Sequence, residues 1–134
     1  MNWADMTLRE FQSALASSSP TPGGGTASAI ALGQAASLSI MVCDLTLGNE
    51  KWKDGWTIAE QIQMMAIPMM GRSNDLATED SQAFDRVMEG FGLPKTTDEE
   101  KSERRGAIRN ATLEAAIVPF ETGLLYTSPS PRDH

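Results

Sequence analysis

The sequence predicts an all-α fold, a helical bundle with long and partly kinked helices. Apolar residues recur at three- and four-residue spacing along most of the chain, and no segment alternates in the manner of a half-buried strand. Capping-box patterns precede three of these stretches, and no internal repeat is present. With 134 residues, the chain has the length of one domain.

The first two predicted helices lie on either side of a loop rich in proline and glycine. Thr7-Leu-Arg-Glu10 has the spacing of a capping box, and it predicts a short helix to about Ala16. A second helix is predicted from Thr26 to about Leu47. Because its residues are small or apolar around most of its circumference, we expect it to be central, with Cys43 in the core.

A segment with two tryptophans connects the second helix to the third. Gly48-Asn49 predicts the end of the second helix. The residues from Lys51 to Gly55 predict a connecting loop, which we expect Trp52 and Trp56 to anchor.

The third predicted helix is the longest of the chain. Thr57-Ile-Ala-Glu60 repeats the capping-box spacing, and apolar residues continue at helical intervals to Gly90. Pro68 predicts a kink or a short break that extends to about Ser73. We expect the methionines between residues 64 and 88 to be flexible core fillers.

A fourth helix is predicted after a turn that contains glycine and proline. Thr97-Asp-Glu-Glu100 caps it, and its apolar residues extend to Val118. Residues 1–122 are thus predicted to form one helical domain, which we expect to be incomplete. The composition changes abruptly at residues 123–134, which we interpret as a non-native tail from sequence assembly, with a genuine disordered tail as the alternative.

Charge and composition exclude several classes of function. A net charge of −7 argues against a nucleic-acid partner and an anionic membrane surface. The N-terminus lacks a secretory pattern, and no run of eighteen wholly apolar residues is present, so we expect a cytoplasmic protein. The sole histidine is the last residue, His134, which argues against a Ser-His-Asp triad and a histidine-based zinc site.

The junction between the glycine loop and the second helix is the most informative feature of the chain. Prolines stiffen the approach, glycines free the backbone, and Thr26 is expected to cap the helix. Free amides at a helix start attract anions. The candidate binding residues are Gly23, Gly24, Gly25 and Thr26, and the alternative is a tight loop packed beneath a dimer.

Three stretches together resemble the cyclodeaminase/cyclohydrolase family. They are Ser19-Pro-Thr-Pro-Gly-Gly-Gly25, the segment Met41 to Gly48, and Asp80-Ser-Gln-Ala-Phe84 followed by Gly92-Leu-Pro-Lys95. The similarity extends from about Leu8 to Thr122. It implies a helical homodimer that acts on the one-carbon unit between N5 and N10 of tetrahydrofolate, with no metal and no cofactor beyond the folate substrate.

The resemblance also implies roles for individual residues. Asp80 is the candidate acid/base, because a partly buried carboxylate with a raised pKa can move protons near neutral pH. Phe84, one helical turn later, is expected to shield it. The glycine-loop amides are implied to face a carboxylate or the pterin of folate, and Lys51 its glutamate tail. Thr78 departs from the family pattern, which carries an acidic residue there.

Two questions stay open at the level of the sequence. The resemblance does not separate formimino cyclodeamination, which releases ammonia, from methenyl hydrolysis. A catalytically silent helical module that only associates with itself is the alternative to an enzyme.

Overall fold

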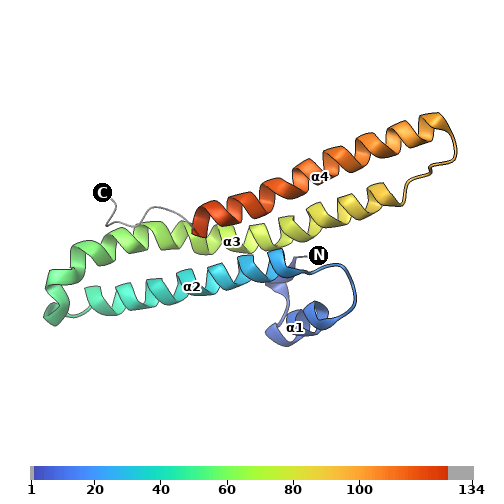
Figure 1. Ribbon diagram of the computed structural model, residues 1–134. Coiled ribbons are helices and arrows are strands. Elements are labelled where there is room, and N and C mark those ends of the chain that lie inside the picture. The colour runs from blue at the N-terminus through green and yellow to red at the C-terminus, as the bar shows by residue number, and fades with distance from the viewer. Residues whose placement is uncertain (1, 127–134) are drawn as a thin grey trace.

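The computed structural model describes residues 2–126 and is an elongated helical structure built along one long helix. Its helices are α1 (Leu8–Ala16), α2 (Gly24–Leu47), α3 (Trp56–Phe91) and α4 (Asp98–Tyr126), with short 3-10 helices at Trp3–Asp5 and Glu50–Gly55. No strand occurs within residues 2–126, which confirms the all-α prediction. α2 runs antiparallel to the first part of α3, and α4 runs antiparallel to its second part (Figure 1).

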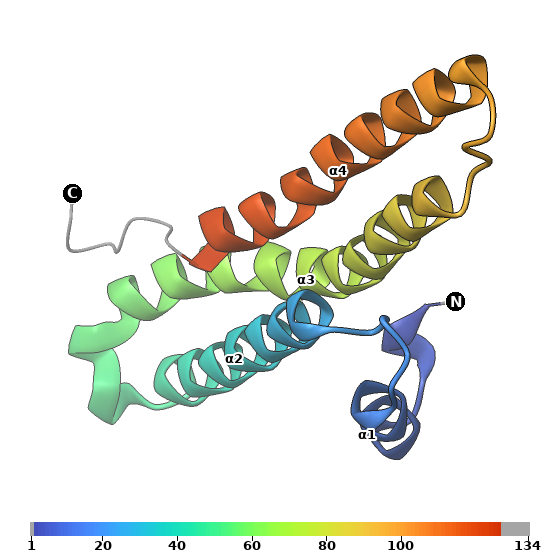
Figure 2. The ribbon, with the colours of Figure 1, turned by 45° about the vertical axis from the view of Figure 1, so that its right-hand side comes forward.

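The N-terminal elements begin and end close to their predicted limits. The Thr7 hydroxyl accepts a hydrogen bond from the Glu10 amide at 3.1 Å, and α1 ends at Ala16 as predicted. Figure 2 shows α1 beside the start of α2, to which the proline and glycine loop connects it. The predicted capping role of Thr26 is wrong, because α2 starts at Gly24 with Gly23 as its N-cap, and Thr26 lies inside the first turn.

α2 is only partly covered, which corrects the expectation that it is central. Its buried residues lie on one narrow face, and Cys43 is among them as predicted. Leu38, Met41, Val42 and Leu45 are all more than half exposed. By length and composition alone α2 could also cross a membrane, but the core helix of a soluble protein meets the same criterion.

One of the two tryptophans anchors the connection between α2 and α3. The Trp56 indole N–H donates to the Thr46 carbonyl at 2.9 Å and fixes the end of α2 against the start of α3. The predicted anchoring role of Trp52 is wrong, because its side chain is 53% exposed and the Lys51 ammonium group lies over its ring. The predicted loop forms a 3-10 helix.

α3 is continuous along its whole length. It begins at Trp56 with Gly55 as N-cap, so the predicted capping box at Thr57 is wrong. The helix includes Pro68, so the predicted break is absent, whereas the kink stays a prediction. The prediction that the methionines fill the core is wrong, because Met64, Met65, Met70 and Met88 are exposed and Met69 is only half-buried.

α4 begins with the capping box predicted for it. The Thr97 hydroxyl accepts from the Glu100 amide at 3.1 Å, and the Glu100 carboxylate accepts from the Thr97 amide at 3.2 Å. The helix continues to Tyr126, beyond the predicted domain end at residue 122. Residues 127–134 of the predicted tail lie outside the described residues, and the domain end stays a prediction.

The core lies where the start of α2, the middle of α3 and the end of α4 meet. Its buried residues come from all three helices and are Ala29, Leu76, Ala77, Ala83 and Val118. Small residues allow the helices to approach closely here. A Cβ atom on Gly33 of α2 would overlap the hydroxyl group of Ser73 on α3, so a larger residue at this crossing would displace that hydroxyl.

Candidate active site

Asp80 lies at this meeting point and packs directly on the first turn of α2. A Cβ atom on Gly25 would lie 2.5 Å from both carboxylate oxygens of Asp80, closer than any real contact. Glycine at position 25 therefore leaves the space that the carboxylate occupies. The glycine loop and Asp80, fifty-five residues apart in the sequence, form one site.

The loop before α2 is itself attached to α3. The Thr21 hydroxyl donates to the Asp85 carboxylate at 3.0 Å, and Pro22 is buried. These contacts hold the loop over α3 one and a half helical turns beyond Asp80. They position the start of α2, and with it Gly25, against the carboxylate.

Thr26 turns its side chain toward α3 and is completely buried. Its hydroxyl lies 3.3 Å from a carboxylate oxygen of Asp80, 3.2 Å from the Ala77 carbonyl oxygen and 2.7 Å from the Ser81 hydroxyl. A fully buried side chain cannot contact a substrate in this conformation. Thr26 thus supports Asp80 from behind through its side chain and its backbone, and its predicted contact with a ligand does not occur in this conformation.

The environment of Asp80 favours its neutral form. Burial raises the pKa of the Asp80 carboxyl above its usual value, because the ionised form loses hydration. Hydrogen bonds from the side chain and backbone of Thr26 act in the opposite direction and lower this pKa. Burial is the largest of these influences, so the pKa of Asp80 is moved toward the range in which general acids and bases exchange protons.

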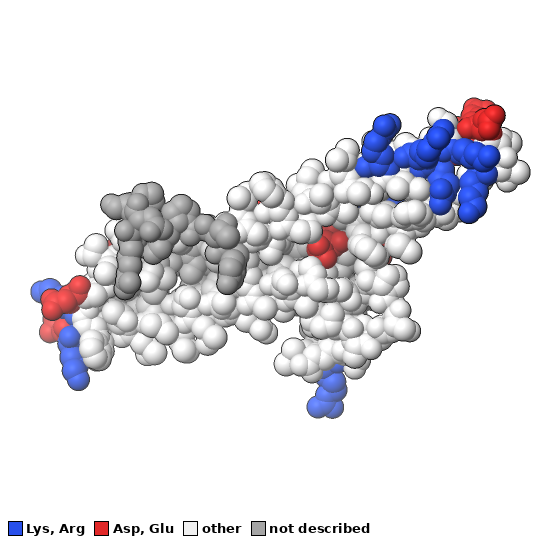
Figure 3. Space-filling view, viewed as in Figure 1, with Lys and Arg blue, Asp and Glu red and all other residues white. Residues whose placement is uncertain are grey.

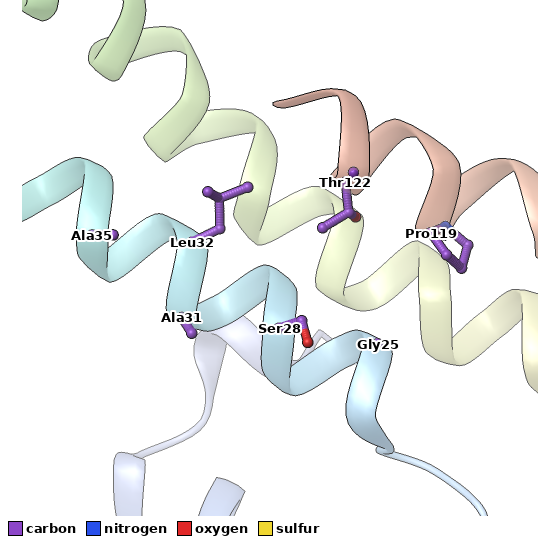
Figure 4. A pocket seen from close by; sticks show the side chains of 8 residues that line it. Gly25, Ser28, Ala31, Leu32, Ala35, Pro119 and Thr122 are labelled. Atoms are coloured by element: carbon purple, nitrogen blue, oxygen red, sulfur yellow. The ribbon is translucent and has the colours of Figure 1, made fainter. Parts of the chain in front are cut away.

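An apolar cavity lies against the first part of α2, and Asp80 is not among the residues that line it. Its volume is about 640 Å³, and Gly25 belongs to its lining. Figure 4 shows Ser28, Leu32 and Ala35 on α2 across from Pro119 and Thr122 on α4. Cavities of this size and character accommodate small organic molecules. Gly25 is therefore the point at which the cavity and the candidate acid/base meet.

The structure does not bring every predicted site residue together. Gly23 and Gly24 lie at the same helix start as Gly25, but a Cβ atom on Gly24 would have no neighbour within 4 Å. Lys51 follows the opposite end of α2, which is about 36 Å long at 1.5 Å per residue. Within one chain, Lys51 and Gly25 cannot contact the same small molecule.

The residues next to Asp80 on α3 have other partners. The Thr78 hydroxyl donates to the Asn2 side chain at 3.0 Å. Glu79 is held by Arg72, so it does not supply the acidic group that the family pattern has at position 78. Phe84 is 41% exposed, so it leaves much of its own surface in solvent, and its shielding role stays a prediction.

One charged cluster was missed by the sequence analysis. The Arg72 guanidinium donates to Glu79 of α3 at 2.9 Å and to Glu121 of α4 at 2.5 Å, and these bonds raise its pKa. Glu121 adjoins Thr122, so this cluster fixes one wall of the cavity. The seven-residue spacing of Arg72 and Glu79 was visible in the sequence, but the pairing with α4 was not.

The other charged side chains are unevenly distributed. In the view of Figure 3, basic side chains gather over the start of α4 and near the connection between α2 and α3. Within residues 2–126, no three histidine, cysteine, aspartate or glutamate side chains are grouped closely enough to hold a metal ion. The predicted absence of a metal stays a prediction.

The chain is similar in sequence to a family of known proteins. Residues 7–126 match the family model described as formiminotransferase-cyclodeaminase. The chain is 41% identical over 114 residues to a methenyltetrahydrofolate cyclohydrolase of Methylorubrum extorquens. The aligned residues cover 85% of this chain and 55% of the relative.

More distant similarity extends to longer proteins of animals. The chain is 31% identical to a formimidoyltransferase-cyclodeaminase of Gallus gallus and 28% identical to that of Mus musculus, over 84% and 87% of this chain. These matches cover 21% and 22% of the two relatives. The chain thus spans about half the length of the bacterial relative and about a fifth of the animal relatives.

Proposed function

Because this chain belongs to the formiminotransferase-cyclodeaminase family, we propose that it carries part of the active site of a folate one-carbon enzyme. The proposed reaction is the hydrolysis of 5,10-methenyltetrahydrofolate. Identity favours it, since the chain is 41% identical to a named cyclohydrolase and 28% to 31% identical to the two animal cyclodeaminases. The observation that carries the proposal is that the partly buried Asp80 carboxylate packs on Gly25, a residue that also lines an apolar cavity.

Asp80 moves the protons of the proposed reaction. As general base it takes one proton from a water molecule while the water oxygen forms a bond to the methenyl carbon. The protonated carboxyl group then returns that proton to N5 as the bond between carbon and N5 breaks. The carbinol proton leaves as the carbonyl forms, so the products are 10-formyltetrahydrofolate and one proton.

The cavity suits the ring systems of such a substrate. Its walls carry Ala31, Leu32, Ala35 and Pro119, which offer apolar surface to flat rings. The amides at the start of α2 lie beside the reacting group and stabilise negative charge that develops on the water-derived oxygen. This arrangement assigns substrate contact to the backbone of the glycine loop, with Gly25 nearest to Asp80.

Formimino cyclodeamination is the second candidate, because the matching family model carries that description. There N10 attacks the formimino carbon, N10 loses its proton, and ammonia leaves after its nitrogen is protonated. Asp80 serves this reaction as well, since it accepts the first proton and donates the second.

We also propose that the protein is a cytoplasmic homodimer. The exposed apolar residues of α2, from Leu38 to Leu45, supply a face that a second copy can bury. Lys51 can reach a folate bound near Gly25 only from another chain, because about 36 Å of helix separates them within one chain.

The test compares the protein expressed from its complete gene with its Asp80→Asn variant. The wild-type protein should consume 5,10-methenyltetrahydrofolate, followed by its absorbance, faster than the buffer reaction. The variant should lose this activity with unchanged circular dichroism. Ammonia release from the formimino substrate, without methenyl hydrolysis, would favour the second candidate. Neither activity, together with the absence of folate binding, would favour a silent self-associating module.

A further inference from the structure

The Thr26 hydroxyl has more acceptors within reach than it has protons. It carries one hydrogen, and Asp80 at 3.3 Å and the Ala77 carbonyl at 3.2 Å can each accept it. The Ser81 hydroxyl lies 2.7 Å away, where either hydroxyl can be the donor, and it can donate to Thr26 whenever the Thr26 proton is directed to Asp80 or to Ala77. Thr26 and Ser81 are 0% and 3% exposed, so water does not compete for these bonds.

We propose that Thr26 is a positioning residue for Asp80, whose hydroxyl reverses its hydrogen bond as the carboxyl group loses and gains a proton. When Asp80 is ionised, Thr26 donates to the carboxylate. When Asp80 is protonated, Thr26 donates to the Ala77 carbonyl and accepts from the carboxyl group of Asp80. No proton leaves the network, and every polar group keeps a partner in both states.

This change of hydrogen-bond partner suits a carboxyl group that must act as both base and acid in one turnover. The predicted effect on catalysis rests on the proposed function. A hydrogen bond that stabilised only the ionised form would hold Asp80 in that form. A hydroxyl with a second acceptor keeps the carboxyl group in one place in both states. The hydrogen-bond arrangement of Thr26 around Asp80 does not depend on which folate derivative is the substrate.

The charged groups of the neighbouring helices are engaged elsewhere. Before Asp44, α2 has no aspartate, glutamate, lysine, arginine or histidine, and its one thiol, Cys43, lies near the opposite end of the helix from Gly25. Glu79 of α3 and Glu121 of α4 both pair with Arg72, and Asp85 accepts from Thr21. Of the influences on the protonation of Asp80, the hydrogen bond from Thr26 is therefore the one that a substitution can change most selectively.

The experiment compares Thr26→Val, which removes the hydroxyl at nearly constant volume, with Thr26→Ser, which keeps it. Thr112→Val is the matched control, because its hydroxyl bonds to the Ile108 carbonyl on exposed α4. The Asp80 side-chain carboxyl carbon is titrated by NMR in protein labelled at aspartate, and its signal is identified by its loss in Asp80→Asn. The pH dependence of kcat for methenyltetrahydrofolate is measured on the same variants.

Thr26→Val should move the titration of Asp80 to higher pH, because the ionised carboxylate loses a donor. At pH values below that midpoint, kcat should fall by the same factor as the ionised fraction of Asp80 measured in the NMR titration. Thr26→Ser should restore both values, and Thr112→Val should change neither. Ser81→Ala should produce a smaller shift in the same direction, and it replaces Thr26→Val if the valine variant does not fold.

Two outcomes would overturn the inference. One is a folded Thr26→Val protein in which Asp80 titrates as in the wild type. The other is a Thr26→Ser variant displaced as far as Thr26→Val. If the wild-type protein turns over no folate, the proposed function fails, but the NMR titration still decides the role of Thr26.

Discussion

Both halves of α2 are largely apolar, the first rich in glycine and alanine and the second in larger side chains, and their environments differ strongly. The first half, from Gly24 to Ala36, buries four residues against α3 and forms the candidate site. The second half, from Ser37 to Leu47, buries only Cys43 and exposes large apolar side chains. The difference arises because α4 ends over the first half and does not extend along the second (Figure 1). Apolar composition alone therefore indicates neither the core nor the site.

The substitution with the largest expected effect removes the proposed acid/base of α3 that packs on the first half of α2. Asp80→Asn should lower kcat by about 10²- to 10⁴-fold, the usual contribution of general acid–base catalysis. The measurement is the rate of methenyltetrahydrofolate hydrolysis, with circular dichroism to check helicity. A variant with wild-type turnover would remove Asp80 from the mechanism.

The same variant should be slightly more stable than the wild type at neutral pH. The folded-state pKa of Asp80 is raised, so the folded protein binds this proton more tightly than the unfolded chain does. Its ionisation then lowers stability as pH rises from the unfolded value of 3.8 through the folded pKa. The difference in melting temperature between Asp80→Asn and wild type should shrink toward pH 4 and grow toward pH 7. The opposite trend would contradict the raised pKa.

Gly25→Ala should disturb the site without removing a reactive group. The new methyl group would lie 2.5 Å from both carboxylate oxygens, so the carboxylate must move. We expect kcat to fall by roughly 10- to 100-fold, since a displacement of about 1 Å has effects of this size. Gly106→Ala is the control on α4, because its Cβ atom would have no neighbour within 4 Å. Equal activity of the two variants would break the proposed link between Gly25 and Asp80.

Truncation of a leucine should lower stability much more at a buried position than at an exposed one. Leu76 is completely buried beneath the first half of α2, and Leu76→Ala should lower the free energy of unfolding by about 2–5 kcal/mol. Leu113→Ala is the matched variant, because Leu113 is 63% exposed on α4, and it should change stability by less than about 0.5 kcal/mol. Denaturant unfolding measures both. Comparable losses would mean that the core lies elsewhere.

The smallest effect is expected for the ion pairs that fasten α4. Arg72→Met should cost no more than about 1 kcal/mol of unfolding free energy, because all three charged side chains are at least a third exposed. The same variant should weaken folate binding, since Glu121 fixes the wall that carries Thr122. Unchanged affinity in an equilibrium titration would separate this cluster from the cavity.

Local sequence patterns predicted the positions of the helices well but predicted poorly which of their faces are buried. The capping boxes at Thr7 and Thr97 depend on neighbouring residues, and both formed. Thr57 has the same spacing, but the helix begins earlier because Trp56 bonds to the end of α2. The exposure of the α3 methionines depends on which faces of α3 the neighbouring helices leave uncovered, which no local pattern contains.

The candidate site also combines features that the sequence predicted with features that depend on helix packing. The resemblance to the family identified Asp80 and the glycine loop, and the structure places both at one junction. The burial of Thr26 and its bond to Ser81 depend on how α2 crosses α3, which spacing along one helix cannot reveal. The distance of Lys51 from the site follows from the length of α2, and it became informative only once the position of Asp80 was known.

The most direct measurement is a crystal structure of the protein with 10-formyltetrahydrofolate bound. The account predicts the folate rings in the cavity between α2 and α4, with the one-carbon unit within about 2.6–3.2 Å of the Asp80 carboxylate, or one water molecule away. A folate bound elsewhere, with the carboxylate of Asp80 facing only solvent, would contradict it.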